Sequence, residues 1–141
     1  MIRKAKMSDS LALVRLSGVL GYAVSRSTVE ENLATTLNDP NHECLVFELK
    51  GNVMGYLEAE VYRPIFAEQV MFNVLGCAVD EASQGQGIGT QLLQALESIA
   101  KTRKIAVIRL NSGEKRRNAH QFYTQQGYQC THLQKRFLKK L

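Results

Sequence analysis

Hydrophobic residues recur along this chain at two spacings, one typical of helices and one typical of strands. Val29, Leu33 and Leu37 recur every four residues, which predicts a helix ending near residue 39. The Ser-x-x-Glu spacing of Ser27 and Glu30 predicts a capping box at the start of this helix. A second, more regular helical face follows the middle of the chain and is formed by Ile88, Leu92, Leu93, Leu96, Ile99 and Ala100.

Shorter apolar runs predict strands. Two of them, at 44–47 and 53–62, flank Lys50-Gly51-Asn52, which predicts a β-hairpin. The remaining predicted elements are strands at 2–5, 70–79, 105–110, 128–133 and 137–141, a helix after Ser8-Asp9, and a helix at 118–126 stopped by Gly127. This order predicts a mixed α/β fold in which a sheet is covered by helices on both faces.

Length and composition predict a single globular domain over residues 1–141. Its 141 residues are 45% hydrophobic and 22% charged, which is ordinary for a globular protein. No apolar run approaches the roughly 20 residues of a membrane span, and the first ten residues lack the apolar stretch of a secretory signal. We therefore expect a cytoplasmic protein with no membrane partner. The three cysteines form no CxxC pair, and no metal site is expected.

Positive charge gathers in the second half of the chain. Residues 1–70 carry 7 Lys/Arg and 9 Asp/Glu, whereas residues 71–141 carry 11 and 4. A basic half favours an anionic partner, either a nucleic acid or a small molecule rich in phosphate. No interleaving of aromatic and basic residues supports nucleic-acid binding, so we expect no nucleic-acid partner.

A glycine-rich segment gives the most specific signal. Gly85, Gly87 and Gly89 alternate between a predicted strand and a predicted helix. Glycine allows a tight turn and a close approach by a ligand, and the first N–H groups of a helix have no partner within the helix. Such a turn can hold a diphosphate. The alternative is that the glycines serve turn geometry alone.

Two well-known phosphate loops do not fit this segment. A nucleotide P-loop needs a lysine after its last glycine, but Thr90 follows Gly89. A dinucleotide loop needs the spacing G-x-G-x-x-G and an acidic residue about 20 positions further on, and this chain has neither.

The segment resembles the signature of the GNAT superfamily of N-acetyltransferases. Its signature Gln/Arg-x-x-Gly-x-Gly/Ala is matched by Gln84-x-x-Gly87-x-Gly89. The family's Asn-Ala-x-x-Phe-Tyr-x-x-x-Gly-Phe/Tyr segment is matched from Asn118 to Tyr128. The resemblance implies the GNAT fold, an α/β fold in which a mixed, mostly antiparallel sheet of six to seven strands is flanked on both faces by about four helices. It also implies transfer of an acyl group from acetyl-CoA to an amine. Dimers are common in the superfamily, which leaves a homodimer open.

The resemblance also implies roles for residues of this chain. It assigns the coenzyme's pantetheine arm to the end of the central strand, and its diphosphate to the glycine loop, residues 84–89. It places Asn118 against the coenzyme and makes Tyr123 the proton donor to the departing thiolate. The implied coenzyme-binding residues are Cys77, Ala78, Val79, Gln84, Gly85, Gln86, Gly87, Ile88, Gly89, Thr90, Asn118 and Tyr123.

The proton acceptor is less well defined. A primary alkylamine has a pKa near 10.4, so a group must take its proton before it attacks. Many relatives carry a glutamate where this chain has Asn73. Glu58 and Glu60 alternate on one face of a predicted strand, so either is a candidate base, and simple exposure to solvent is the alternative. Arg26 or Arg63 is a candidate to bind an anionic group on the acceptor.

Two functions therefore remain open. The first is an N-acetyltransferase that acts on a primary amine of a small molecule or peptide, by direct attack in a ternary complex. The second is a non-catalytic acyl-CoA sensor or regulatory module with the same fold, which the missing strand glutamate favours.

Overall fold

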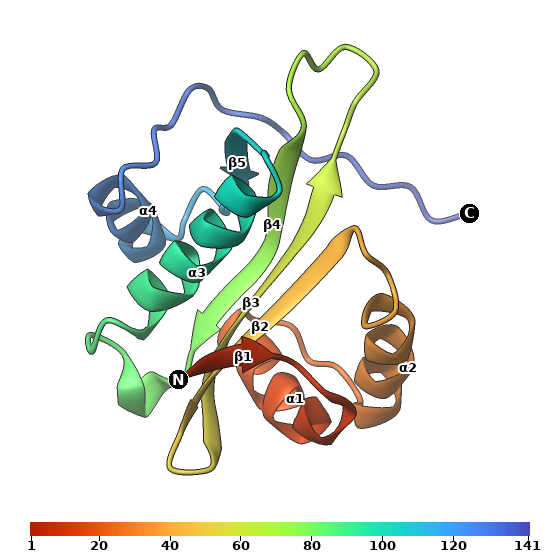
Figure 1. Cartoon of the computed structure of the whole chain (residues 1–141), viewed down its shortest axis with the longest axis vertical. Helices are drawn as coiled ribbons and strands as arrows, with labels where there is room; N and C mark the ends of the chain where they lie inside the picture. Colours follow the sequence, from red (N-terminus) through yellow and green to blue (C-terminus); the bar gives the residue numbers. More distant parts are fainter. The chain divides into compact units, whose positions relative to one another are not determined.

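A computed structural model of the protein describes all 141 residues and divides into two compact units, residues 1–111 and residues 112–141 (Figure 1). The larger unit contains, in order, β1 (Ile2–Lys4), a 3-10 turn η1 (Met7–Asp9), α1 (Ser10–Val19), α2 (Arg26–Thr36), β2 (His42–Leu49), β3 (Asn52–Tyr62), β4 (Met71–Val79), a 3-10 turn η2 (Glu81–Ser83), α3 (Ile88–Thr102) and β5 (Val107–Leu110). The smaller unit contains α4 (Arg117–Gln125).

One sheet organises the larger unit. Its strands lie in the order β1-β2-β3-β4-β5, antiparallel up to β4 and parallel between β4 and β5. The expected α/β fold with a mixed, mostly antiparallel sheet is thus confirmed. The predicted hairpin is also present, and its turn has positive φ at Lys50 (50°) and Gly51 (81°), as a two-residue hairpin turn requires.

Helices cover both faces of this sheet, as predicted (Figure 1). On one face, the α1/α2 face, Leu16 and Leu33 pack into a buried cluster that includes Val46 and Tyr56. The opposite, α3 face carries fully buried residues of the sheet and of α3: Leu57, Phe72, Leu92, Leu93 and Leu96. The approach of α3 is close, because a Cβ atom at Gly55 would lie 2.9 Å from Ile88 Cγ2 and 3.2 Å from Leu92 Cδ1.

A β-bulge interrupts the pairing of β3 with β4. Glu58 lies opposite Gly76, but the next residue of β3, Ala59, lies opposite Val74. Leu75 is therefore an extra residue of β4 without a partner in β3, and its side chain is exposed. A bulge of this kind shifts the alternation of the bulged strand by one residue. As a result, Asn73 lies opposite Glu60 and shares a sheet face with it.

The sheet has five strands, so the prediction of six to seven was wrong. The predicted strands at 128–133 and 137–141 are absent, and residues 128–141 have no regular secondary structure. A strand needs a hydrogen-bonded neighbour, and the apolar residues of this segment are spaced among charged ones rather than in a continuous buried run. Four of them are largely exposed: Leu133, Phe137, Leu138 and Leu141.

The predicted capping box of the second helix was also wrong, because α2 begins earlier. Its N-cap is Ser25, whose Oγ accepts a hydrogen bond from the Thr28 N–H at 3.2 Å. Glu30 instead accepts from Arg26 Nε at 2.6 Å, one helical turn away. Ser25 and Ser27 can both act as helix N-caps, and the structure uses Ser25.

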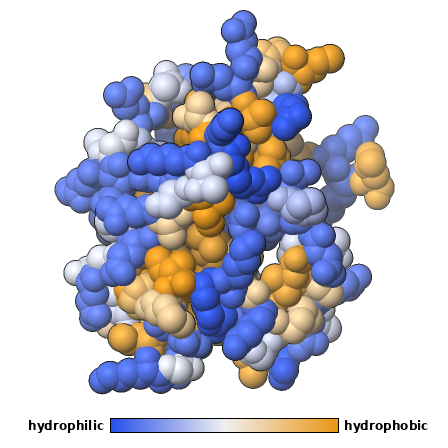
Figure 2. Space-filling model, in the orientation of Figure 1, coloured by the Kyte–Doolittle hydropathy of each residue, from blue (hydrophilic) through white to orange (hydrophobic).

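The surface is mostly hydrophilic, with hydrophobic residues showing in patches (Figure 2). Ile65 and Phe66, in the connection between β3 and β4, are among the most exposed apolar residues. None of the helices combines the length and the apolar character needed to cross a membrane.

Candidate functional site

The glycine loop leads directly from the end of β4 into α3. Gly85 and Gly87 have φ angles of 80° and 81°, a conformation that disfavours other residues. Nothing lies within 4 Å of a Cβ placed on either glycine, so the loop backbone is open to an approaching molecule. Gly89 lies in the first turn of α3 and does not share this conformation.

The N-terminus of α3 has no side-chain cap. Its N-cap residue is Gly87, which has no side chain to accept a hydrogen bond. The first backbone hydrogen bond of the helix runs from the Gln91 N–H to the Gly87 carbonyl at 3.0 Å. The N–H groups of 88–90 therefore begin the helix at the positive end of its dipole, where an anionic oxygen is stabilised.

Side chains fasten this loop to the sheet. Gln84 Nε2 donates to the Val79 carbonyl at 3.1 Å, which ties the loop to the last residue of β4. Asp80 Oδ1 accepts from the Ala82 N–H at 3.2 Å, and its Oδ2 lies 3.2 Å from Arg15 Nε. Arg15 also donates to the Val53 carbonyl at 2.6 Å. The signature glutamine and an arginine of α1 thus fix the entrance of the loop.

The end of β4 extends beyond the end of β5. The two strands pair over four residues of each, Met71–Val74 with Val107–Leu110. Residues 75–79 of β4 continue toward the glycine loop without a β5 partner, while residues 76–79 remain paired with β3. This geometry leaves one edge of the predicted pantetheine segment, residues 77–79, outside the β5 ladder, where an extended molecule can lie beside it.

The two candidate bases, Glu58 and Glu60, lie on the α1/α2 face of β3, and each has a different partner. Glu58 Oε2 lies 2.7 Å from His42 Nε2, and the side chains are 33% and 10% exposed. The hydrogen bond that His42 donates to the Glu58 carboxylate raises the pKa of His42, against the opposing effect of burial. The pair therefore favours a charged imidazolium beside a carboxylate.

Glu60 contacts a neutral partner instead. Asn73 Nδ2 donates to Glu60 Oε1 at 3.2 Å, and Asn73 Oδ1 accepts from Arg109 Nη1 at 3.0 Å. The Arg109 guanidinium also stacks over the ring of Tyr62, 4.6 Å from its centroid. Asn73, which replaces the glutamate expected by resemblance, thus connects a carboxylate on β3 with a guanidinium on β5.

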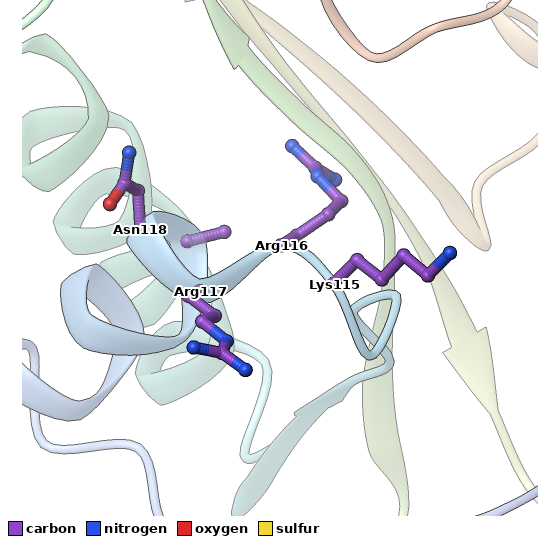
Figure 3. A pocket seen from close by; sticks show the side chains of 5 residues that line it. Lys115, Arg116, Arg117 and Asn118 are labelled. Carbon is purple, nitrogen blue, oxygen red and sulfur yellow. The ribbon is translucent and has the colours of Figure 1, made fainter.

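In the smaller unit, α4 carries the other predicted site residues. Asn118 lies in its first turn, and Tyr123 lies one and a half turns further on, its ring 5.3 Å from that of Phe122 and 6.1 Å from that of Tyr128. Gly127, with φ of 91°, ends the helix as predicted. A hollow of about 260 Å³ at the start of α4 is lined by Lys115, Arg116, Arg117, Asn118 and Ala119 (Figure 3).

The hollow is strongly basic. Three consecutive cations precede Asn118, and Figure 3 shows their charged ends spread to different sides of the chain. This local positive charge favours an anionic group such as a phosphate.

Sequence reasoning found the loop and both glutamates but missed their neighbours. His42, Asn73 and Arg109 meet the glutamates only through strand register, and Arg15 reaches the loop from α1. The candidate anion ligand Arg26 is engaged by Glu30, and Arg63 is exposed beyond the end of β3. The roles of the predicted catalytic and coenzyme-binding residues stay predictions.

Known proteins resemble this chain in sequence and in fold. The family model for the acetyltransferase (GNAT) family matches residues 14–128. An aminoalkylphosphonate N-acetyltransferase of Salmonella typhimurium is 30% identical over 111 residues, which cover 79% of this chain and 71% of that protein.

Solved structures agree with the sequence match. An aminoglycoside 6'-N-acetyltransferase from Acinetobacter haemolyticus superposes with a TM-score of 0.85 at 18% identity, covering 100% of this chain and 99% of that chain. The structure of AAC(6')-Iy in complex with a bisubstrate analogue of CoA superposes with a TM-score of 0.87 at 12% identity, covering 100% and 98%. At these identities the likeness establishes the fold. The chain belongs to the acetyltransferase (GNAT) family and is an acyltransferase.

Proposed function

We propose that the protein transfers the acetyl group of acetyl-CoA to a primary amine of a small molecule or peptide, by direct attack within a ternary complex. The observation that carries this proposal is the glycine loop. Its two positive-φ glycines are open to solvent and precede the uncapped N-terminus of α3. The loop follows the end of β4, which extends beyond its neighbour β5. The named acceptors of the relatives, aminoalkylphosphonates and aminoglycosides, are the first classes to test.

The residues of the larger unit fit the coenzyme as follows. The loop backbone and the first N–H groups of α3, over Gln84 to Thr90, would bind the diphosphate, because open glycines admit its oxygens. Cys77, Ala78 and Val79 would bind the pantetheine arm as an added strand along the edge of β4 that β5 leaves. The side chain of Gln84 would also support the binding site, because its amide holds the loop against the Val79 carbonyl.

The smaller unit would supply the remaining coenzyme contacts. Asn118 would contact the coenzyme, and the basic hollow beside it would bind a phosphate group. The Tyr123 hydroxyl would donate a proton to the departing thiolate. A phenol with a pKa near 10 is well matched to an alkyl thiolate as a proton donor.

The reaction makes a bond between the amine nitrogen and the acetyl carbon and breaks the bond between that carbon and sulfur. The nitrogen gives up a proton to a base, and the sulfur receives one from an acid. Glu60 is the stronger candidate base, because the group that donates a hydrogen bond to it is the neutral amide of Asn73 rather than a charged side chain. Glu58 is paired with His42 and would serve mainly to attract the cationic amine.

Two measurements test the proposal. Saturating acetyl-CoA should raise the melting temperature, since a ligand at 100 times its Kd adds about 2.7 kcal/mol to the unfolding free energy. Thiol release should then follow addition of an amine from a panel of amino acids, aminophosphonates, polyamines, aminoglycosides and peptides. Stabilisation without thiol release across the panel would favour the acyl-CoA sensor instead, and no stabilisation at all would refute both functions.

A further inference from the structure

Four adjacent strands each contribute one polar residue to a line across the sheet. His42 of β2 is in register with Glu60 of β3, Glu60 with Asn73 of β4, and Asn73 with Arg109 of β5. We call these four residues the polar row. The hydrogen bonds through Asn73 show that the row lies on one face of the sheet, and Glu60 belongs to the face that also carries Tyr56 and the α1/α2 cluster.

Arg109 and Glu60, the two charged residues on either side of Asn73, are held in place by hydrogen bonds but are not paired with an opposite charge. Neither Arg109 nor Glu60 takes part in an ion pair, since no oppositely charged nitrogen or oxygen lies within 4.0 Å of either charged group. Asn73 uses one guanidinium nitrogen of Arg109, and the Tyr62 ring covers one side of its plane. The guanidinium still has donors to spare in a fixed orientation, which is how arginine recognises a carboxylate or a phosphonate.

The row lies next to the place where acyl transfer is proposed. Glu60 is opposite Asn73, the last but one residue of β4 that pairs with β5, and Glu58 is opposite Gly76, just past the end of that pairing. The unpaired edge of β4 begins at Leu75. An amine that attacks at this edge therefore has carboxylates beside it and a guanidinium one strand further on.

The separation of the charges limits the size of the molecule that can bridge them. Glu60 Oε1 lies 3.2 Å from Asn73 Nδ2, and Arg109 Nη1 lies 3.0 Å from Asn73 Oδ1, so the two charged groups are held at the two ends of one side-chain amide. A molecule that contacts both groups across this one amide must carry its own two charges only a few bonds apart. This separation suits a short chain with an ammonium at one end and an anionic group at the other.

We propose that the acceptor is a small zwitterion, a primary amine that also carries a carboxylate or phosphonate, and that Arg109 binds its anionic group while the glutamates attract its ammonium. This inference rests on the proposed acetyl transfer and narrows its substrate class. A polycationic acceptor would place positive charge against Arg109 without a carboxylate between them. Arg109 is thus a specificity residue that sequence reading, which considered Arg26 and Arg63, did not find.

The test compares three amines in a thiol-release assay: 2-aminoethylphosphonate, the neutral 2-methoxyethylamine and the polycation kanamycin. The wild-type kcat/KM is expected to be at least tenfold higher for the phosphonate than for either other amine. Arg109→Gln should lower kcat/KM for the phosphonate at least tenfold more than for 2-methoxyethylamine, mainly through KM. Lys101→Gln, which removes an exposed charge from the last turn of α3, is the charge-matched control and should keep the preference.

Calorimetry makes the result independent of turnover. Wild-type protein saturated with CoA should bind 2-aminoethylphosphonate, Arg109→Gln should bind it at least tenfold more weakly, and both should bind acetyl-CoA equally, which shows that the variant is folded. A preference for the neutral or polycationic amine, or an equal loss for all three amines in the variant, overturns the inference. Binding of the phosphonate without any thiol release supports the polar row and refutes the proposed transfer.

Discussion

Replacing Gly87 by alanine places a methyl group in the space in front of α3 where the diphosphate is proposed to bind. Gly87 has φ of 81°, and no atom lies within 4 Å of the added Cβ. The methyl group therefore meets no protein atom in the free protein. Its cost there is the left-handed backbone conformation, roughly 1–2 kcal/mol for a residue with a Cβ.

The chain contains a matched control for this substitution. Gly51, in the turn between β2 and β3, also has φ of 81° and also has no atom within 4 Å of a built Cβ. Gly51→Ala should therefore carry the same backbone cost at a turn outside the proposed coenzyme site. Both variants should melt a few degrees lower, since 1 kcal/mol corresponds to roughly 2–4 °C for a chain of about 150 residues.

The two variants should differ in coenzyme binding. Calorimetry with acetyl-CoA should give a wild-type Kd for Gly51→Ala and a Kd at least tenfold weaker for Gly87→Ala, a difference of about 1.4 kcal/mol or more. Equal affinities in the two variants would refute the assignment of the diphosphate to the glycine loop. Very different melting temperatures would refute the claim that the two glycines carry equal backbone strain.

Three further substitutions test the remaining roles. Tyr123→Phe should lower kcat at least tenfold and leave the acetyl-CoA Kd unchanged by calorimetry; unchanged turnover would remove the hydroxyl from the reaction. Glu60→Gln should alter the pH–rate profile, and a profile identical to wild type would exclude it as the base. The raised pKa of His42 means that its pair with Glu58 stabilises the fold fully below about pH 6.5 and less as pH rises through the raised value. Urea unfolding of His42→Gln should lack this loss, and an unchanged pH dependence would show that the pair contributes nothing.

Local chemistry explains why the loop could be predicted from sequence. Positive-φ glycines, a helix start and a strand end follow one another within residues 79–90, so each signal lies within a few positions of the next. The hairpin at Lys50-Gly51 was predictable for the same reason. Gly89 looked equivalent to its neighbours but serves as an ordinary residue of the first turn of α3.

The polar row could not be predicted in this way. Its hydrogen bonds join residues 13 and 36 positions apart, and they depend on register between strands. The prediction of two C-terminal strands, at 128–133 and 137–141, was wrong for a related reason. Apolar spacing alone does not show whether a neighbouring strand is available to pair with. Residues that reach a site by register are found from the sheet rather than from the motif.

The bulged residue Leu75 determines which side chains of β4 face each side of the sheet. If Leu75 were instead paired in the ladder, strict alternation along the strand would turn every upstream side chain of β4 to the opposite face. The fully buried ring of Phe72 would then face the glutamates, and the amide of Asn73 would be forced into the apolar layer beneath α3. One unpaired residue therefore keeps the Asn73 amide beside Glu60, where the acceptor is proposed to bind.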